Sequence, residues 1–277
     1  MNSKKVVFSV MMLLSMFSFI GCGSQESKDQ KAEKRILEAL QEKYGEEFVL
    51  DSIGGGWGTM NSNTLKAIVY PKQDESIRVA VEITKDLKNV YDDYLNEAVA
   101  KAAEKPIEQL AKTIWGDVKV TNGNDTGMMY PDHSDIHMSY ERFLELYPMN
   151  WQLVTIYVQG DSYVDSEGKM DQESEIEKYK EFAKLLADNK YVKSDVIIAY
   201  LTPDAYARFN EAQQSVRTVM NFYTNEEEEE GKLNFITMNG YKLDENGQII
   251  ESDEKINEDF DRWEETRTNW VEKRGGA

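Results

Sequence analysis

A single cysteine limits how the folded part of this chain can be stabilised. Cys22 is the only thiol among 277 residues, and it closes an apolar run near the N-terminus. The chain after it therefore folds without disulfide bonds, thiolate metal sites or a cysteine nucleophile. Its stability has to come from hydrophobic cores, and 40% hydrophobic content in a chain of this length supplies one large core or two small ones.

The N-terminus has the layout of a secretory signal. Lys4 and Lys5 precede an uncharged run over residues 6–20 that is rich in Val, Met, Leu and Phe. A run of about 15 residues suits a signal peptide, whereas a membrane-spanning helix needs roughly 20. We predict a signal peptide over residues 1–21 with cleavage after Gly21. The alternative is an uncleaved anchor with an incidental cysteine.

The residues around the cysteine carry a specific resemblance. Phe19-Ile20-Gly21-Cys22 resembles the lipobox of bacterial lipoproteins, which signal peptidase II cleaves, although Leu is usual where Phe19 stands. The resemblance implies that the thiol of Cys22 carries diacylglycerol and that Cys22 becomes the new N-terminus. Two acyl chains hold a protein firmly, since each buried methylene contributes roughly 0.8 kcal/mol. The implied location is the extracytoplasmic face of the cell membrane.

The charge balance excludes one class of partner. The net charge is −19, with 51 acidic against 32 basic residues. Nucleic acids bind proteins through Lys and Arg side chains that neutralise phosphates, so we expect no nucleic-acid partner. Anionic lipid headgroups should also repel a protein of this charge.

The residues after the cysteine predict a tether. Residues 22–30 are small, polar or charged, and we expect them to be flexible. Four cationic residues follow the predicted anchor. They either reduce the repulsion between the acidic protein and anionic lipid or are ordinary solvated residues of a helix, and the sequence leaves both interpretations open. The residues concerned are Lys28, Lys31, Lys34 and Arg35.

Apolar periodicity predicts an α+β subdomain over residues 31–125. A first helix should end near Gly45, and Pro106 should kink or split a second helix. The glycine-rich stretch 54–58 lacks the spacing of a phosphate-binding loop and indicates a turn between strands. The expected strands cover residues 48–53, 65–70, 77–84 and 117–121, and the second helix covers 92–114.

Residues 122–135 form the predicted boundary, because they are rich in Gly, Asn, Asp and Pro and show no apolar periodicity. A second α+β subdomain follows over residues 136–273. The predicted fold class is therefore α+β, with two packed subdomains and mainly antiparallel or mixed sheets. The strands expected in the second subdomain cover residues 153–158, 195–201 and 232–238. Two of its expected helices cover residues 140–147 and 203–212. A third begins with a capping box of Ser174 and Glu177, and a fourth is lined by Ile256, Phe260, Trp263 and Trp270.

Two stretches of the second subdomain are less regular. Residues 215–224 are ambiguous, because they either extend the preceding helix or form a separate structure. The glutamate run at 226–230 is expected to be a solvated loop, since like charges repel one another.

A second resemblance covers roughly residues 34–212. "KYGEEFVLDSIGGGWGT", followed by "YDDYLNEAVAKAAEKPIEQL", resembles an uncharacterised group of Gram-positive lipoproteins. The shared features are structural: strand, glycine turn, strand and helix. The resemblance implies an envelope lipoprotein and implies no reaction.

No pattern of chemistry-bearing residues predicts a catalytic or metal site. His133 and His137 are the only histidines, and their spacing suits a metal only on a helix, whereas Pro131 indicates a loop or a helix start. Three turn-like stretches lack the end residues of a calcium-binding loop. They are residues 122–127, 165–168 and 244–247. We expect no enzyme activity, no metal and no cofactor.

Two functions remain. The first is a lipid-anchored envelope protein that binds a protein partner, either an adaptor to an envelope machine or an immunity-like protein that neutralises a secreted toxin. The second is a solute-binding lipoprotein that serves a transporter. The sequence names neither the partner nor the ligand.

Overall fold

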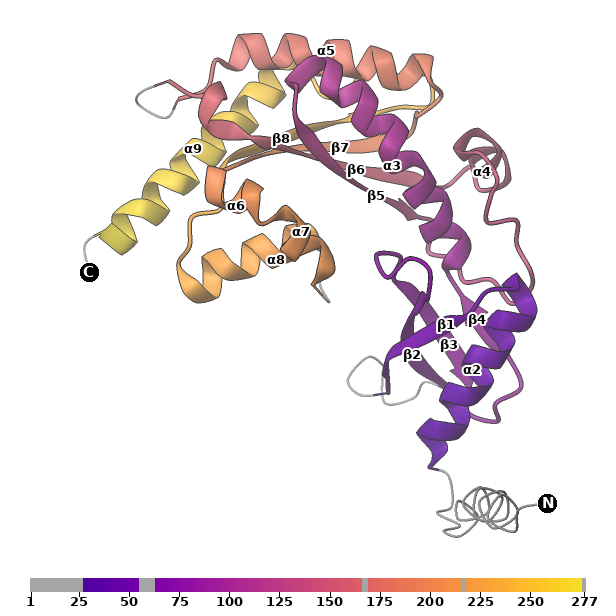
Figure 1. Cartoon of the computed structure of the whole chain (residues 1–277). Helices are drawn as coiled ribbons and strands as arrows, with labels where there is room; N and C mark the ends of the chain where they lie inside the picture. Colours follow the sequence, from indigo (N-terminus) through magenta and orange to yellow (C-terminus); the bar gives the residue numbers. More distant parts are fainter. Residues whose placement is uncertain (1–26, 55–62, 166–168, 216–217, 276–277) are drawn as a thin grey trace, which may run out of the picture.

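The protein is an α+β molecule, as predicted, and its described residues form two four-stranded sheets (Figure 1). The structure is a computed structural model that describes residues 27–54, 63–165, 169–215 and 218–275, with side chains up to residue 269. Gly21, Cys22 and the predicted turn beyond Gly54 lie outside the described residues. Within the described ranges, no helix combines the length and the apolar character needed to cross a membrane.

The helix α2 (Lys28–Tyr44) follows a capping box. Ser27 Oγ accepts from the Gln30 N–H at 3.2 Å, and Gln30 Oε1 accepts from the Ser27 N–H at 2.9 Å. The predicted flexible tether is therefore wrong for residues 28–30, because these two bonds start the helix at Lys28. The helix ends at Gly45 as predicted, where a φ of 74° favours glycine.

The first sheet is an antiparallel meander ordered β1-β2-β3-β4. Its strands are β1 (Phe48–Ile53), β2 (Thr64–Pro71), β3 (Val79–Thr84) and β4 (Val90–Asp92). The sequence predicted the first three and missed β4, since three residues are too few to show alternation. α2 covers one face of this sheet. The core between them includes Ala32, Ile36, Leu40, Val69, Val79, Val81 and Ile83.

The long helix α3 (Tyr94–Trp115) links the two sheets (Figure 1). Its first turns bury Leu95 and Val99 in a small cluster with the chain after β5, and its later turns belong to the core of the second sheet. Of the two outcomes predicted at Pro106, a kink or a split, the split is wrong, because the helix is continuous from Tyr94 to Trp115. Ala103 and Ile107, on either side of the proline, are both anchored in that core.

The strand β5 (Val118–Asp125) corrects the predicted boundary. All eight of its residues pair with β6 (Trp151–Gln159), so the strand belongs to the second sheet and not to the first subdomain. Its polar end stays in the ladder because its side chains bond to α3. Asn122 Nδ2 donates to Ala100 O at 2.9 Å, and Asn124 Nδ2 donates to Asn96 O at 3.0 Å.

The second sheet is mixed and ordered β5-β6-β7-β8. β7 (Ser194–Leu201) runs parallel to β6, and α5 (Gln172–Asp188) provides the crossover that a parallel pair needs. β8 (Phe235–Leu243) pairs antiparallel with β7. α5 begins after Asp171, whose carboxylate accepts from the Ser174 N–H, so the predicted cap at Ser174 is displaced by three residues.

α3 and α5 pack on one face of the second sheet, and three short helices cover part of the other (Figure 1). These are α6 (Pro203–Ala207), α7 (Phe209–Gln214) and α8 (Val219–Asn225). Thr202 caps α6 as predicted. Thr218 caps α8, which shows that the ambiguous stretch 215–224 contains a separate helix and not an extension.

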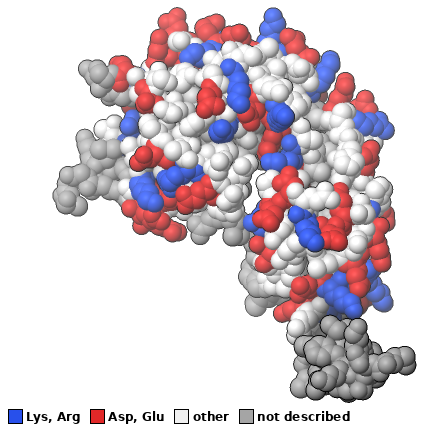
Figure 2. Space-filling model, in the orientation of Figure 1, with Lys and Arg blue, Asp and Glu red and all other residues white. Residues whose placement is uncertain are grey.

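The remaining elements flank the sheets. α4 (Tyr140–Leu146) and the 3-10 helix η1 (Gly160–Tyr163) are short, and α9 (Asp253–Gly275) packs beside β8. Ile256 and Phe260 of α9 enter the core of the second sheet, as the periodicity predicted. Acidic side chains are spread over the visible face of both parts of the molecule (Figure 2).

Candidate interaction groove

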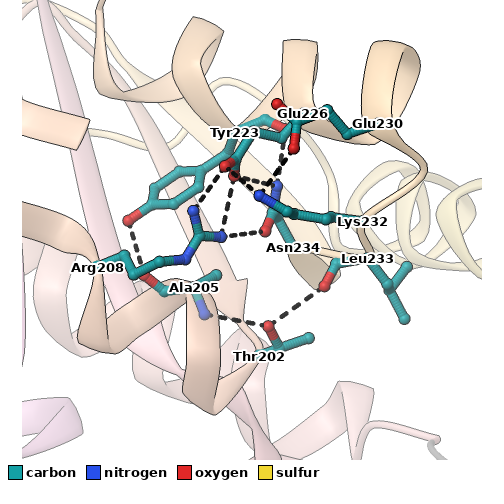
Figure 3. A network of polar contacts seen from close by, with 9 residues as sticks. All are labelled: Thr202, Ala205, Arg208, Tyr223, Glu226, Glu230, Lys232, Leu233 and Asn234. Carbon is teal, nitrogen blue, oxygen red and sulfur yellow. Dashed lines mark hydrogen bonds and ion pairs between the residues drawn. The ribbon is translucent and has the colours of Figure 1, made fainter. Parts of the chain in front are cut away.

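A buried polar network fixes the start of β8 (Figure 3). The Arg208 guanidinium, between α6 and α7, donates to both carboxylate oxygens of Glu226 at 2.6 and 2.9 Å and to Asn234 Oδ1 at 3.0 Å. Asn234 Nδ2 donates to Glu226 at 3.0 Å and to Tyr223 O at 2.9 Å. Asn234 directly precedes β8, so the network holds the three short helices and the first residue of that strand in one arrangement.

The prediction of a solvated loop at 226–230 is wrong at its first residue. Glu226 is only 9% exposed, and the run forms a helical turn, η2 (Glu226–Glu230). Burial opposes ionisation of Glu226, but hydrogen bonds from Arg208 and Lys232 outweigh it, so the pKa of this carboxyl lies below its usual value. The ion pair is therefore present at neutral pH. Arg208 lies too far away in the sequence for a charge-run pattern to reveal it.

Within the described residues, β8 is the last strand of its sheet, and its outer edge is met only by an isolated bridge between Leu243 and Ile249. Antiparallel pairing alternates residues that bond to the neighbouring strand with residues whose backbone points away from it. The Lys242 N–H donates to Glu251 Oε2 at 2.7 Å, and the Ile250 N–H donates to Lys242 O at 2.9 Å, so Lys242 points away from β7. The alternation then directs the backbone groups of Gly240 and Met238 outward as well, and the Gly240 N–H donates to Asn239 Oδ1 at 2.6 Å.

A groove of about 420 Å³ lies between this edge and α9. Ile197 and Met238 supply apolar surface from the sheet, and Trp263 and Thr266 line the groove from α9. Trp263 packs edge-on against Phe235 with ring centroids 6.2 Å apart, which ties the wall of the groove to the start of β8. Its indole N–H is buried and has no hydrogen-bond partner within the described residues.

Glycine is required at the centre of this strand. A Cβ on Gly240 would lie 2.2 Å from Val196 O of β7, far inside contact distance. The residue therefore serves the close packing of the two strands.

The charges of the groove are mostly acidic and already paired. Lys242 Nζ lies 3.7 Å from Asp195, and Arg262 donates to Asp259 at 2.9 Å, which leaves Glu251 as the additional acid. Burial raises the pKa of Asp195, with Lys242 opposing and Glu251 adding to the rise. The groove therefore has apolar surface with an acidic rim, in a protein whose net charge is −19.

The predicted histidines do not form a site. His133 and His137 are both exposed, and His133 Nδ1 lies 2.5 Å from the backbone oxygen of Lys43. Within the ranges that the structure describes, no cluster of His, Cys, Asp and Glu side chains would hold a metal ion. The stretch 122–127 is largely part of β5, and 244–247 is a turn closed by Asp244.

Comparisons with known proteins reveal a likeness of fold. No family model matches the chain, and no curated protein matches it. Among solved structures, it resembles the crystal structure of a DUF5037 family protein from Ruminococcus gnavus ATCC 29149, with a TM-score of 0.53 and 15% identity. The match covers 83% of this chain and 98% of that one. At this identity the likeness concerns the fold alone.

Sequence analysis missed the groove entirely. Its residues come from β7, β8, the chain after β8 and α9. Local sequence patterns predict neither the pairing of β7 with β8 nor the position of α9. The one local signal is Gly240 in the interior of a strand, which is typical of a close backbone approach.

Proposed function

We propose that this protein is a lipid-anchored protein on the extracytoplasmic face of the cell membrane and that its groove binds an extended segment of a partner protein. The observation that carries the binding role is the outward-facing edge of β8 beside α9. Extended peptides commonly bind by adding a strand to such an edge, where backbone bonds supply affinity and neighbouring pockets supply specificity. The anchor rests on the lipobox resemblance around Cys22.

The charge of the groove defines the partner segment. Its lining holds three carboxylates and two cations, a further cation, Lys255, lies 2.6 Å from Asp259, and the whole chain carries −19. A basic, extended segment with alternating apolar residues would place its apolar side chains over Ile197 and Met238 and its cations at the rim. Complementary charge also speeds the encounter between partners. We propose binding and not a reaction as the role of the groove.

The alternative of solute binding has less support. A cavity of about 170 Å³ lies on the outer face of the first sheet, lined in part by Ile68, Ala80 and Met129. Pockets for small ligands usually measure about 300–1,000 Å³. The groove beside β8 is larger, but it is open along its length and suits a chain better than an enclosed molecule.

Site-specific photo-cross-linking tests the proposed groove. A photoreactive residue replaces Thr266, which lines the groove, or its neighbour Glu265, which is exposed on α9 and does not. In intact cells, position 266 should capture a specific envelope or secreted protein at least tenfold more efficiently than position 265. An alternating Lys–Val peptide should compete with this capture, and an alternating Glu–Val peptide should not.

Two results would contradict the groove assignment. One is equal capture from positions 265 and 266, which would place the partner elsewhere on the surface. The other is that the acidic peptide competes with capture at position 266 as well as the basic peptide does, because charge would then not contribute to binding in the groove. As a folding control, both variants should have the same thermal unfolding midpoint as the wild-type protein.

A further inference from the structure

The start of α2 carries more cations than acids, since residues 28–35 hold four Lys and Arg residues against Asp29 and Glu33, whereas the whole chain has a net charge of −19. Lys28, Lys31, Lys34 and Arg35, which we call the basic end, recur at the three- and four-residue spacing of neighbours on a helix surface. The opposite side of the helix buries Ala32, Ile36 and Leu40 in the first core. Lys and Arg side chains are visible at the lower end of the described molecule in Figure 2, where α2 begins in Figure 1.

The cations of the basic end are available for an external partner. Within the described residues, Lys28, Lys31 and Lys34 take part in no ion pair. Arg35 meets Glu42 only at 3.5 Å, with side chains 36% and 72% exposed. Exposed pairs of this kind hold a side chain weakly, so an anionic surface competes readily for Arg35.

A polar pocket of about 330 Å³ adjoins the basic end. α2 contributes Arg35 and Lys43, the turn between β3 and β4 contributes Lys88, and the chain after β5 contributes His133. Glu42 and Asp132 also line it. Lys43 is held in place by Asp92 at 2.6 Å and Tyr130 O at 2.6 Å, while Lys88 is largely exposed and only paired with Asp86 at 3.3 Å. The pocket lining therefore includes Arg35 and Lys88, whose ion pairs are exposed, together with Lys43, whose charge is already paired with Asp92.

We propose that the basic end and this pocket contact anionic phospholipid headgroups of the membrane that holds Cys22. The proposal rests on the proposed lipid anchor. Cys22 precedes Lys28 by six residues, a span of at most about 20 Å when extended, so the anchor keeps the basic end near the bilayer. Juxtamembrane cations attract the anionic surface within about a Debye length, roughly 8 Å in physiological salt.

The contact orients the whole molecule. The acidic remainder of the chain is repelled by the same surface that attracts the basic end. Figure 1 shows the start of α2 at one end of the molecule and the second sheet with α9 at the other. In this orientation the groove beside β8 faces away from the bilayer and is accessible to a partner.

Fluorescence quenching at two positions tests the orientation. The lipidated protein is reconstituted in vesicles with a headgroup-labelled quencher lipid and carries a fluorophore on a new cysteine, since the proposal has Cys22 blocked by its lipid. The reporters are Asp86→Cys, in the turn beside the basic end, and Thr266→Cys, in the groove. With phosphatidylglycerol present, quenching should be at least threefold stronger at position 86 than at 266.

Charge and lipid composition supply the controls. The Lys31→Glu/Lys34→Glu variant, or vesicles of phosphatidylcholine alone, should bring the two reporters to similar quenching. The matched variant Lys105→Glu/Lys184→Glu changes two exposed lysines away from the basic end and should keep the difference. Equal quenching of both reporters in the wild-type protein, or a difference that survives Lys31→Glu/Lys34→Glu, would overturn the proposal. Failure of the anchor itself is distinct, because the protein would then not co-float with vesicles.

Discussion

Replacing Asp92 by alanine is expected to lower the free energy of unfolding by about 3–5 kcal/mol. The Asp92 carboxylate is fully buried and accepts from Lys43 Nζ at 2.6 Å and from the Tyr44 hydroxyl at 2.7 Å. It also accepts from the Tyr94 N–H at 3.1 Å. The Asp92 side chain thus connects the end of α2, the strand β4 and the start of α3. Its removal leaves the Lys43 ammonium without a counter-charge, and the Lys43 side chain is only 9% exposed.

Chemical denaturation of the wild-type and Asp92→Ala proteins measures this loss. The double variant Lys43→Met/Asp92→Leu removes both charges and should recover part of the stability, because no isolated charge remains buried. The exposed pair between Lys72 and Glu47, also at 2.7 Å, provides the matched control, and Glu47→Ala should have no measurable effect. A loss no larger for Asp92→Ala than for Glu47→Ala would contradict the role assigned to the buried pair.

The protein is expected to become less stable as the pH rises from 5 to 8, by about 2–4 kcal/mol. Burial, with the neighbouring charge of Asp92, raises the pKa of Asp93 to about 7. Burial, with the charges of Asp93 and Glu104, raises the pKa of Glu97 to about 8. Both groups bind a proton in the folded state at pH values where the unfolded chain has released it. Their contribution is therefore full near pH 4 and is lost as the pH rises through 7 and 8.

Neutral isosteres at these two positions test the sign of the dependence. Asn in place of Asp93 can still accept from the Ala80 N–H, which now donates to Asp93 Oδ1 at 2.8 Å. Asp93→Asn and Glu97→Gln should each flatten the pH profile and raise stability at pH 8 by about 1–2 kcal/mol. Urea denaturation at several pH values measures how the free energy of unfolding of each protein changes with pH. A wild-type profile that rises toward pH 8, or one that Asp93→Asn and Glu97→Gln leave unchanged, would contradict the assignment.

Local patterns predicted the elements of this fold well where one face of an element is buried. β3 alternates and α2 shows an apolar stripe of Ala32, Ile36 and Leu40, and both lie where the pattern placed them. Local patterns failed where polar side chains form hydrogen bonds with residues far away in the sequence. The Asn-Gly-Asn-Asp end of β5 was interpreted as a boundary loop, because nothing local indicates that Asn122 and Asn124 bond to the backbone of α3.

The candidate site was less predictable than the fold, for the same physical reason. Glu226 was assigned to solvent from its charged neighbours, but Arg208 and Asn234 compensate its burial from elements that are adjacent only in the folded chain. The groove likewise depends on the order of strands in the second sheet, which places β8 at an edge. The anchor is the opposite case, since the residues around Cys22 carry its signature within a few positions.

Mass spectrometry of the mature N-terminus tests the proposed lipid anchor at Cys22. Protein isolated from the membrane fraction of cells that express the whole chain is digested, and its N-terminal peptide is identified. We expect a peptide that begins at Cys22 with diacylglycerol on the thiol, and loss of membrane attachment in Cys22→Ala. An N-terminal peptide that begins before Cys22, or a Cys22 thiol without lipid, would contradict the anchor and the membrane orientation that depends on it.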